Sequence, residues 1–141
     1  MDPLREVVQI PSDGFRVKVD ALRELLPSTP VLQAILSRYA AGLPMQVAQT
    51  AACNRLHKIE EHLGRWLLLA QDRLNSGVVP ITHDFLATML GTDRPSVTVA
   101  AGILQREGPI AYTRGSVRIL NRKKLEGFAC ECYGLIKQYN S

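Results

Sequence analysis

Side chains that could recognise a DNA base pair are concentrated in a short stretch beginning at Arg94. An arginine in the first turn of a helix can donate two hydrogen bonds to O6 and N7 of one guanine, which discriminates against other bases by about 1–3 kcal/mol. The methyl groups of Thr98 and Val99 can contact the methyl group of a thymine. We therefore predict that Arg94, Thr98 and Val99 read bases.

Hydroxyl and cationic side chains around this stretch could bind the phosphates of a DNA backbone. The window from Thr92 to Lys124 holds seven basic and two acidic residues, which leaves a net charge of −1 for the rest of a +4 chain. A charge concentrated in one segment is typical of polyanion binders, although a solvated basic surface is the alternative when charge is considered alone. The candidate backbone contacts are Thr82, Ser96, Arg114, Arg118, Arg122, Lys123 and Lys124. For Ser96, a role in capping the helix is an equal alternative, and Arg106 fits a solvated helix surface better.

Two short helices joined at a glycine would position these side chains. Thr82 suits the N-cap of a helix over residues 83–90, and Gly91 suits the left-handed residue that follows a helix. Thr92 or Asp93 then caps a second helix, which ends at Gly108. This spacing is typical of a helix-turn-helix, whose second helix enters the major groove by its N-terminus. We expect the helix dipole and free N–H groups at that end to favour phosphates.

A hairpin follows the second helix. The runs 110–113 and 116–120 have strand-like composition, and Arg114-Gly115 between them suits a two-residue turn. The hairpin is a wing, so the sequence predicts a winged helix-turn-helix over roughly Thr82 to Leu120. A last helix is expected from Arg122 through Ile136, with Cys132 on its buried side.

A long helical pattern precedes these elements. Apolar residues recur every three to four positions between Ser28 and Gly77, which predicts about 45 residues of nearly continuous helix, kinked near Pro44. A helix of this length needs a partner, either a second copy of the chain or its own domain. The expected dimer seam comprises Leu36, Tyr39, Leu43, Val47 and Thr50. Before it, Phe15–Val19 alternates like a strand, and Asp20 begins a short helix that Pro27 ends.

The cysteines and histidines predict no metal site. Cys53, Cys130 and Cys132 are odd in number, and they are expected to be reduced, mostly buried thiols. The pair Cys130 and Cys132 is too sparse for zinc, which needs four ligands, and the histidines do not cluster with them in sequence. We therefore expect neither a metal nor a cofactor.

Several other classes of protein are excluded or disfavoured. No apolar run approaches the roughly 18 residues of a membrane span, and the N-terminus lacks the pattern of a signal peptide, so a cytoplasmic protein is expected. The sequence contains no phosphate-cradling glycine loop, no H-E-x-x-H and no G-x-S-x-G, so we do not expect an enzyme. The expected fold is mainly α, with a small β-hairpin wing.

The chain resembles the Crp/Fnr family of bacterial regulators. The likeness is carried by Gln46–Arg55, Arg65–Ala70, Thr82–Arg106 and Ala129–Tyr133. It implies homodimerisation through the long helix, a two-fold symmetric operator in duplex DNA, and RNA polymerase as a further partner. It also implies that base reading falls to Arg94, Pro95, Thr98 and Val99.

The resemblance also implies a division of the chain. Residues 1–27 would be a remnant of the family's sensor domain, residues 28–77 a long kinked dimerisation helix, and residues 78–141 the winged helix-turn-helix domain. The pocket for a cyclic nucleotide and the N-terminal cysteines that hold an iron–sulfur cluster in some members are missing, so neither ligand is expected. The function expected is a sequence-specific transcriptional regulator. The alternative is a truncated, dominant-negative partner that heterodimerises with full-length relatives and has no operator of its own.

Overall fold

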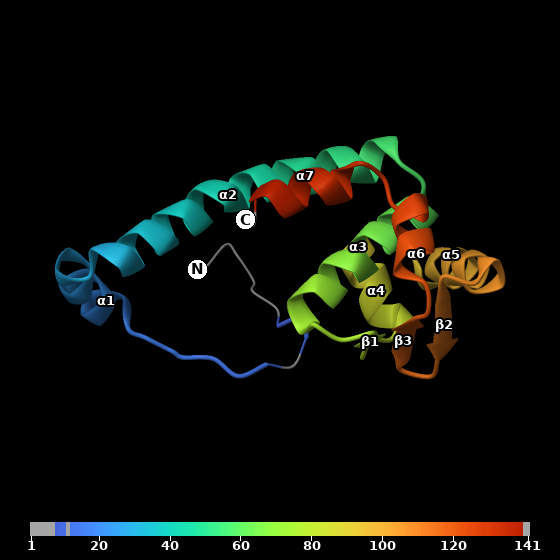
Figure 1. Ribbon diagram of the computed structural model, residues 1–141, viewed down its shortest axis with the longest axis horizontal. Coiled ribbons are helices and arrows are strands. Elements are labelled where there is room, and N and C mark those ends of the chain that lie inside the picture. The colour runs from blue at the N-terminus through green and yellow to red at the C-terminus, as the bar shows by residue number, and fades with distance from the viewer. Residues whose placement is uncertain (1–7, 11, 140–141) are drawn as a thin grey trace. The chain divides into compact units, whose positions relative to one another are not determined.

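Helices make up most of the chain, and a small antiparallel sheet completes it. The structure is a computed structural model that describes residues 8–10 and 12–139. Its described part contains seven α-helices, one short 3-10 helix and three strands (Figure 1). The chain divides into two units, Met1–Ser37 and Arg38–Ser141. No described helix is long and apolar enough to cross a membrane. These observations confirm the predicted fold class.

The first unit differs from expectation at its start. Residues 12–18 form no strand and are exposed, so the expected strand over Phe15–Val19 is wrong. An alternating segment forms a strand only where it has a partner with which to pair its backbone groups. Helix α1 (Val19–Leu25) begins at Val19, and Asp20 lies in its first turn. A 3-10 helix, η1 (Leu26–Ser28), follows. Residues 1–7 and 11 of the expected sensor remnant lie outside the described residues.

The expected single long helix is two helices. Helix α2 (Pro30–Leu56) passes through Pro44 without interruption, and α3 (Ile59–Leu74) begins after a break at residues 57 and 58. The backbone N–H of Lys58 donates to Glu61 Oε2 at 2.8 Å, which caps the start of α3. The apolar spacing continues across the break, so periodicity alone did not reveal it. Helix α2 is therefore the long helix of this chain.

Helix α3 is the centre of the second unit. Its buried residues include Leu63, Leu67 and Leu68, each fully buried. It packs against α5 (Arg94–Glu107), α6 (Arg122–Phe128) and α7 (Cys132–Tyr139), while α4 (His83–Leu90) packs against α5. The helix-turn-helix thus has α3 as its supporting core.

The sheet holds the wing against these helices. Strands β1 (Val78–Val79), β3 (Ser116–Ile119) and β2 (Ile110–Thr113) lie in that order, and all neighbours are antiparallel. Along β3, Val117 and Ile119 are buried while Arg118 is exposed, as the two-residue period of a strand requires. The hairpin therefore presents Arg118 to solvent from a buried framework.

The expected last helix is also interrupted. Residues 129–131 separate α6 from α7, and this turn lies against α3 at Gly64. A Cβ at Gly64 would lie 3.3 Å from the backbone nitrogen of Ala129, closer than most side chains allow. Cys132 is buried, which confirms its expected place in the core.

Candidate nucleic-acid interface

The turn of the helix-turn-helix is built by local capping. Thr82 Oγ1 accepts from the Phe85 N–H at 3.3 Å, and Gly91 ends α4 in the left-handed region with φ +65°. Asp93 Oδ1 accepts from the Ser96 N–H at 2.8 Å and so caps α5. These contacts confirm the expected caps, and they fix the direction in which α5 leaves the turn.

The exposed face of α5 gathers the predicted base readers. Arg94, Pro95, Thr98 and Val99 are all exposed on the first two turns, and Val99 is 63% exposed despite its apolar side chain. The opposite face packs into the core through Val97, Ala100, Ala101 and Leu104. An amphipathic helix with an apolar core face and a mixed exposed face is what groove insertion requires.

Two of these side chains are held by neighbours. Arg94 Nε lies 3.6 Å from Asp84 Oδ1, and both side chains are mostly exposed, so the ion pair is weak. The Thr98 hydroxyl donates to the carbonyl of Arg94 at 3.0 Å and lies 3.1 Å from His83 Nδ1. The Thr98 hydroxyl is thus engaged within the protein, which leaves the methyl group as the part of the side chain available for an outside contact.

The N-terminus of α5 is not the phosphate site that the sequence suggested. One oxygen of the Asp93 carboxylate accepts a hydrogen bond from the Ser96 N–H, and the other accepts from the Ser96 hydroxyl at 2.8 Å. Pro95 has no N–H to donate. These hydrogen bonds lower the pKa of Asp93, so the carboxylate is charged at neutral pH. An anion approaching this helix end would therefore meet a negative charge.

The wing places two arginines on the surface. Arg114 lies in the turn between β2 and β3, where Gly115 has φ +84°, and Thr113 Oγ1 and Ser116 Oγ lie 2.8 Å apart across the turn. Both Arg114 and Arg118 are exposed. The geometry leaves these two charges free to approach a polyanion.

The three cations that open α6 have different surroundings. Lys123 is exposed, and Lys124 donates to the backbone carbonyl of Glu107 at the end of α5. Arg122 instead pairs with Asp72 at 2.8 Å and with Glu126 at 3.0 Å, and its Nη1 donates to Gln71 Oε1 at 2.7 Å. Its charge is thus balanced within the protein, although it was predicted to contact the DNA backbone.

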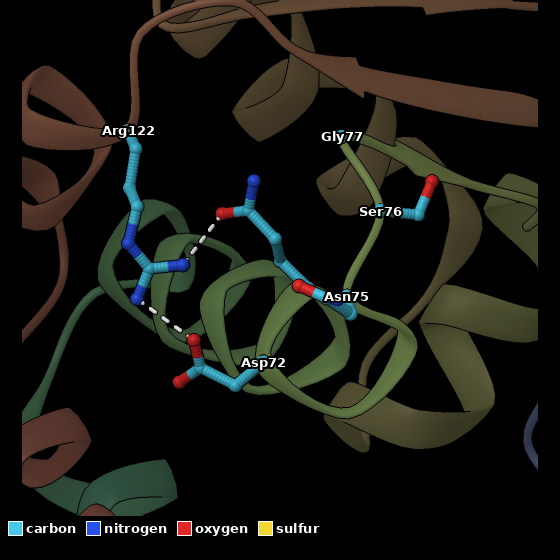
Figure 2. Close-up of a pocket in the computed structure, with 6 residues that line it drawn as sticks. Asp72, Asn75, Ser76, Gly77 and Arg122 are labelled. Carbon is cyan, nitrogen blue, oxygen red and sulfur yellow. Dashed lines mark hydrogen bonds and ion pairs between the residues drawn. The ribbon is translucent and has the colours of Figure 1, made fainter.

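Figure 2 shows Arg122 reaching from α6 toward Asp72 on α3, beside a surface pocket of about 260 Å³. Asn75, Ser76 and Gly77 line the pocket on the side where α3 ends. The Tyr133 hydroxyl donates to Asp72 at 2.8 Å and accepts from Arg122. Burial, together with the hydrogen bond to Asp72, raises the pKa of Tyr133 to about 12. This network ties α6 and α7 to α3.

A family model decides what this arrangement is. The model of the Crp-like helix-turn-helix domain matches residues 61–128, from the first turn of α3 to the end of α6. The chain carries a Crp-like helix-turn-helix domain. This confirms the resemblance to the Crp/Fnr family, which is a family of transcriptional regulators.

Solved structures share the fold. FixK2 from Bradyrhizobium japonicum is 18% identical with a TM-score of 0.71, and the match covers 81% of this chain and 60% of that one. A CooA mutant from Carboxydothermus hydrogenoformans is 15% identical with a TM-score of 0.66, covering 79% and 55%. A crp/fnr family regulator from Eubacterium rectale is 20% identical with a TM-score of 0.59, covering 77% and 50%. The match thus spans between half and three fifths of the length of each of these proteins. No curated protein matches it.

The expected dimer seam of this Crp-like chain lies on α2. Tyr39 and Val47 are 66% and 61% exposed, Leu43 is 44% exposed, and Leu36 is half-buried. Thr50 differs, because its hydroxyl donates to the Gln46 carbonyl at 2.8 Å and lies 3.4 Å from Arg65 Nη1 of α3. Thr50 therefore faces its own domain at least in part.

Sequence reasoning missed His83 of the Crp-like domain. Its ring stacks on Tyr112 of β2 with centroids 4.0 Å apart, and its Nδ1 contacts Thr98 of α5. Burial and the charge of Arg94 lower the pKa of His83, so the ring is neutral at physiological pH. The residue joins α4, α5 and the wing, and no local sequence signal links these three positions.

Proposed function

We propose that the chain is a transcription regulator that binds duplex DNA sequence-specifically, as a homodimer on a two-fold symmetric operator. The observation that carries the proposal is the joint exposure of Arg94, Pro95, Thr98 and Val99 on the first two turns of α5. The Crp-like family match supports DNA binding, and the exposed cations of the wing and α6 supply the charge complementarity.

In this proposal α5 enters the major groove by its N-terminus. Arg94 leaves its weak pair with Asp84 and donates two hydrogen bonds to a guanine, which discriminates by about 1–3 kcal/mol. The Thr98 methyl group and Val99 contact a thymine methyl group. Pro95 has no backbone N–H to donate, so it would contribute only van der Waals contact to the groove. Asp93 faces the groove as a charged cap, which disfavours a phosphate directly at the helix end.

The backbone is contacted by side chains around α5. Arg114 and Arg118 extend from the wing, and Lys123 and Lys124 from α6, with Thr82 as a hydroxyl donor. Ser96 could donate to a phosphate only by releasing its hydrogen bond to Asp93. Each phosphate neutralised changes the slope of log affinity against log salt by about −0.9. Arg122 acts indirectly, because its network with Asp72 fixes α6 and so positions the two lysines.

The dimer forms through the apolar face of α2. Cys53 is the single buried residue of α2, so most of this 27-residue helix is left uncovered by the part of the chain that the structure describes. Pairing two such helices removes Tyr39, Leu43 and Val47 from water. The two α5 helices then address half-sites of opposite orientation.

Selection from a randomised duplex library tests the proposal. The purified chain should enrich a two-fold symmetric sequence, and the complex should weaken steeply as salt rises. A salt-sensitive complex without an enriched sequence would refute specific recognition. Absence of any complex, with co-purification of a longer relative, would instead favour the dominant-negative role.

A further inference from the structure

Three cysteines and a histidine meet in the interior of the second unit. Cys53, His57, Cys130 and Cys132 each point a ligand atom into one small volume, where all four atoms lie within 4.8 Å of one another. The three cysteines are buried and form a cluster of their own, while His57 is half-buried. We propose that these four side chains bind one zinc ion, which contradicts the expectation from sequence that the chain holds no metal.

The fold explains why residues distant in sequence converge. Cys53 lies in the last turn of α2 and His57 directly follows that helix. The His57 N–H donates to the Cys53 carbonyl at 3.1 Å, so the helical turn continues and places both side chains on the same side. Cys130 and Cys132 flank Glu131 in the turn between α6 and α7, with Cys132 as the first residue of α7. The segment that joins α6 to α7 thus supplies two thiols, and the end of α2 supplies one thiol and one imidazole.

The distances suit a single tetrahedral ion. Cys53 Sγ and Cys130 Sγ lie 3.4 Å apart, and Cys132 Sγ lies 3.7 Å from His57 Nδ1. A disulfide would need a separation of about 2.05 Å. Sulfur ligands at about 2.3 Å from a tetrahedral zinc lie about 3.8 Å from each other, and three Cys with one His is a common zinc ligand set.

Neighbouring groups orient the ligands. Glu131 Oε1 lies 3.2 Å from His57 Nε2, a position from which the carboxylate would accept the Nε2 proton while Nδ1 binds the metal. Gln49 Nε2 donates to Cys132 Sγ at 3.0 Å, the kind of outer hydrogen bond that orients a ligand sulfur. His62 Nε2 contacts the Cys53 carbonyl at 2.8 Å and so fixes the backbone of that ligand.

The local charge also fits. Zinc displaces one proton from each of the three thiols as it binds, and with a neutral imidazole the complete site carries a charge of −1. Arg65 is 4% exposed and interacts electrostatically with Cys53. Among the described residues its Nε has no hydrogen-bond partner, and its Nη1 has a long contact to Thr50. A buried cation of this kind offsets the negative site.

Such an ion would join the end of α2 to the turn between α6 and α7. Since that turn also packs on α3 at Gly64, the ion would fix the base of the long helix to the core of the Crp-like domain. Its role would be structural, because all four coordination positions are filled by protein.

Metal analysis of the full chain tests the proposal. The protein is purified under reducing conditions without a polyhistidine tag, and its zinc content is measured by plasma mass spectrometry. We expect one zinc per chain, and little in Cys132→Ser. Glu131→Gln should keep zinc with an affinity weakened about 10–100-fold in chelator competition, because it only orients His57. The control Glu107→Gln changes an exposed carboxylate on α5 and should have no effect.

A second measurement covers variants that fail to fold. Metal-free wild-type protein is titrated with Co²⁺, which should produce a thiolate-to-metal absorption band and the ligand-field bands of a tetrahedral site at one equivalent. The three thiols should resist alkylation until a chelator is added. Wild-type protein that contains no zinc and gives no such band would overturn the proposal, as would full zinc retention in Cys132→Ser. DNA binding enters neither measurement, so the result is independent of the proposed function.

Discussion

At the scale of single residues, Arg94 offers the most direct test of the proposed DNA recognition. Its side chain is 65% exposed and its pair with Asp84 spans 3.6 Å, so the side chain contributes little to the stability of the fold. Arg94→Ala should relax base preference at one position per half-site by about 1–3 kcal/mol, as measured by binding-site selection. Its thermal unfolding should match that of the wild type. An unchanged binding profile would show that α5 does not read the groove as proposed.

Arg122 and Lys123 are neighbours whose charges have different uses. Arg122 bonds to Asp72, Gln71 and Tyr133, whereas Lys123 is exposed. Arg122→Gln should lower the free energy of unfolding by about 1–2 kcal/mol in urea titration, since charge-assisted hydrogen bonds are lost.

Lys123→Gln removes the same charge and serves as the control. It should leave stability unchanged, weaken all DNA sequences similarly, and make the salt slope shallower by about 0.9. If Arg122→Gln changed the salt slope by as much and left stability intact, Arg122 would be a phosphate contact after all.

At the scale of elements, local chemistry was sufficient to predict the helix-turn-helix. Thr82, Gly91, Asp93 and Gly108 act through hydrogen bonds or backbone angles within a few residues, so their roles could be read from the sequence. The break between α2 and α3 could not, because Glu61 recaps the chain within an uninterrupted apolar pattern.

The cysteine and histidine cluster was invisible for a different reason. Cys53 and Cys130 are brought together by the packing of the α6–α7 turn, and neither segment alone holds enough ligands for zinc. The internal pairing of Arg122 likewise depends on Asp72 of α3, and no spacing rule connects the two positions. Long-range packing therefore decides the features that the sequence did not predict.

Two helical glycines allow a matched test of helix packing. Gly102 of α5 has open space at the position of a Cβ, whereas a Cβ at Gly64 of α3 would press on Ala129. Gly102→Ala should raise the free energy of unfolding by up to about 1 kcal/mol through helix propensity. Gly64→Ala should lower it, because the α6–α7 turn must move. Equal gains in both variants, measured by urea unfolding without DNA, would show that α3 and the turn are not in close contact.

At the scale of the whole molecule, the proposed dimer explains both the exposed apolar residues of α2 and the exposed cations of the Crp-like domain. A single winged helix contacts one half-site, and several phosphate contacts give it mostly non-specific affinity. Specificity for a two-fold operator requires two α5 helices at a fixed separation. The proposed zinc ion would contribute by holding the end of α2 against the domain that it positions.

The dimer can be tested on neighbouring residues of α2. Val47→Glu places a charge on the apolar face, while the control Ala48→Glu places it about 100° around the helix, on another exposed face. We expect Val47→Glu to raise the dimer dissociation constant at least about tenfold in sedimentation equilibrium, because a buried charge opposes the seam. Ala48→Glu should leave it unchanged.

The same pair of variants separates assembly from groove recognition. Val47→Glu should lose affinity for a two-half-site operator and keep its weak affinity for an isolated half-site, since α5 and the wing are intact. Equal losses on both duplexes would mean that the substitution disturbs the domain itself. A wild-type chain that stays monomeric at high concentration would leave α5 without a paired neighbour, and a two-fold operator would then have no physical basis.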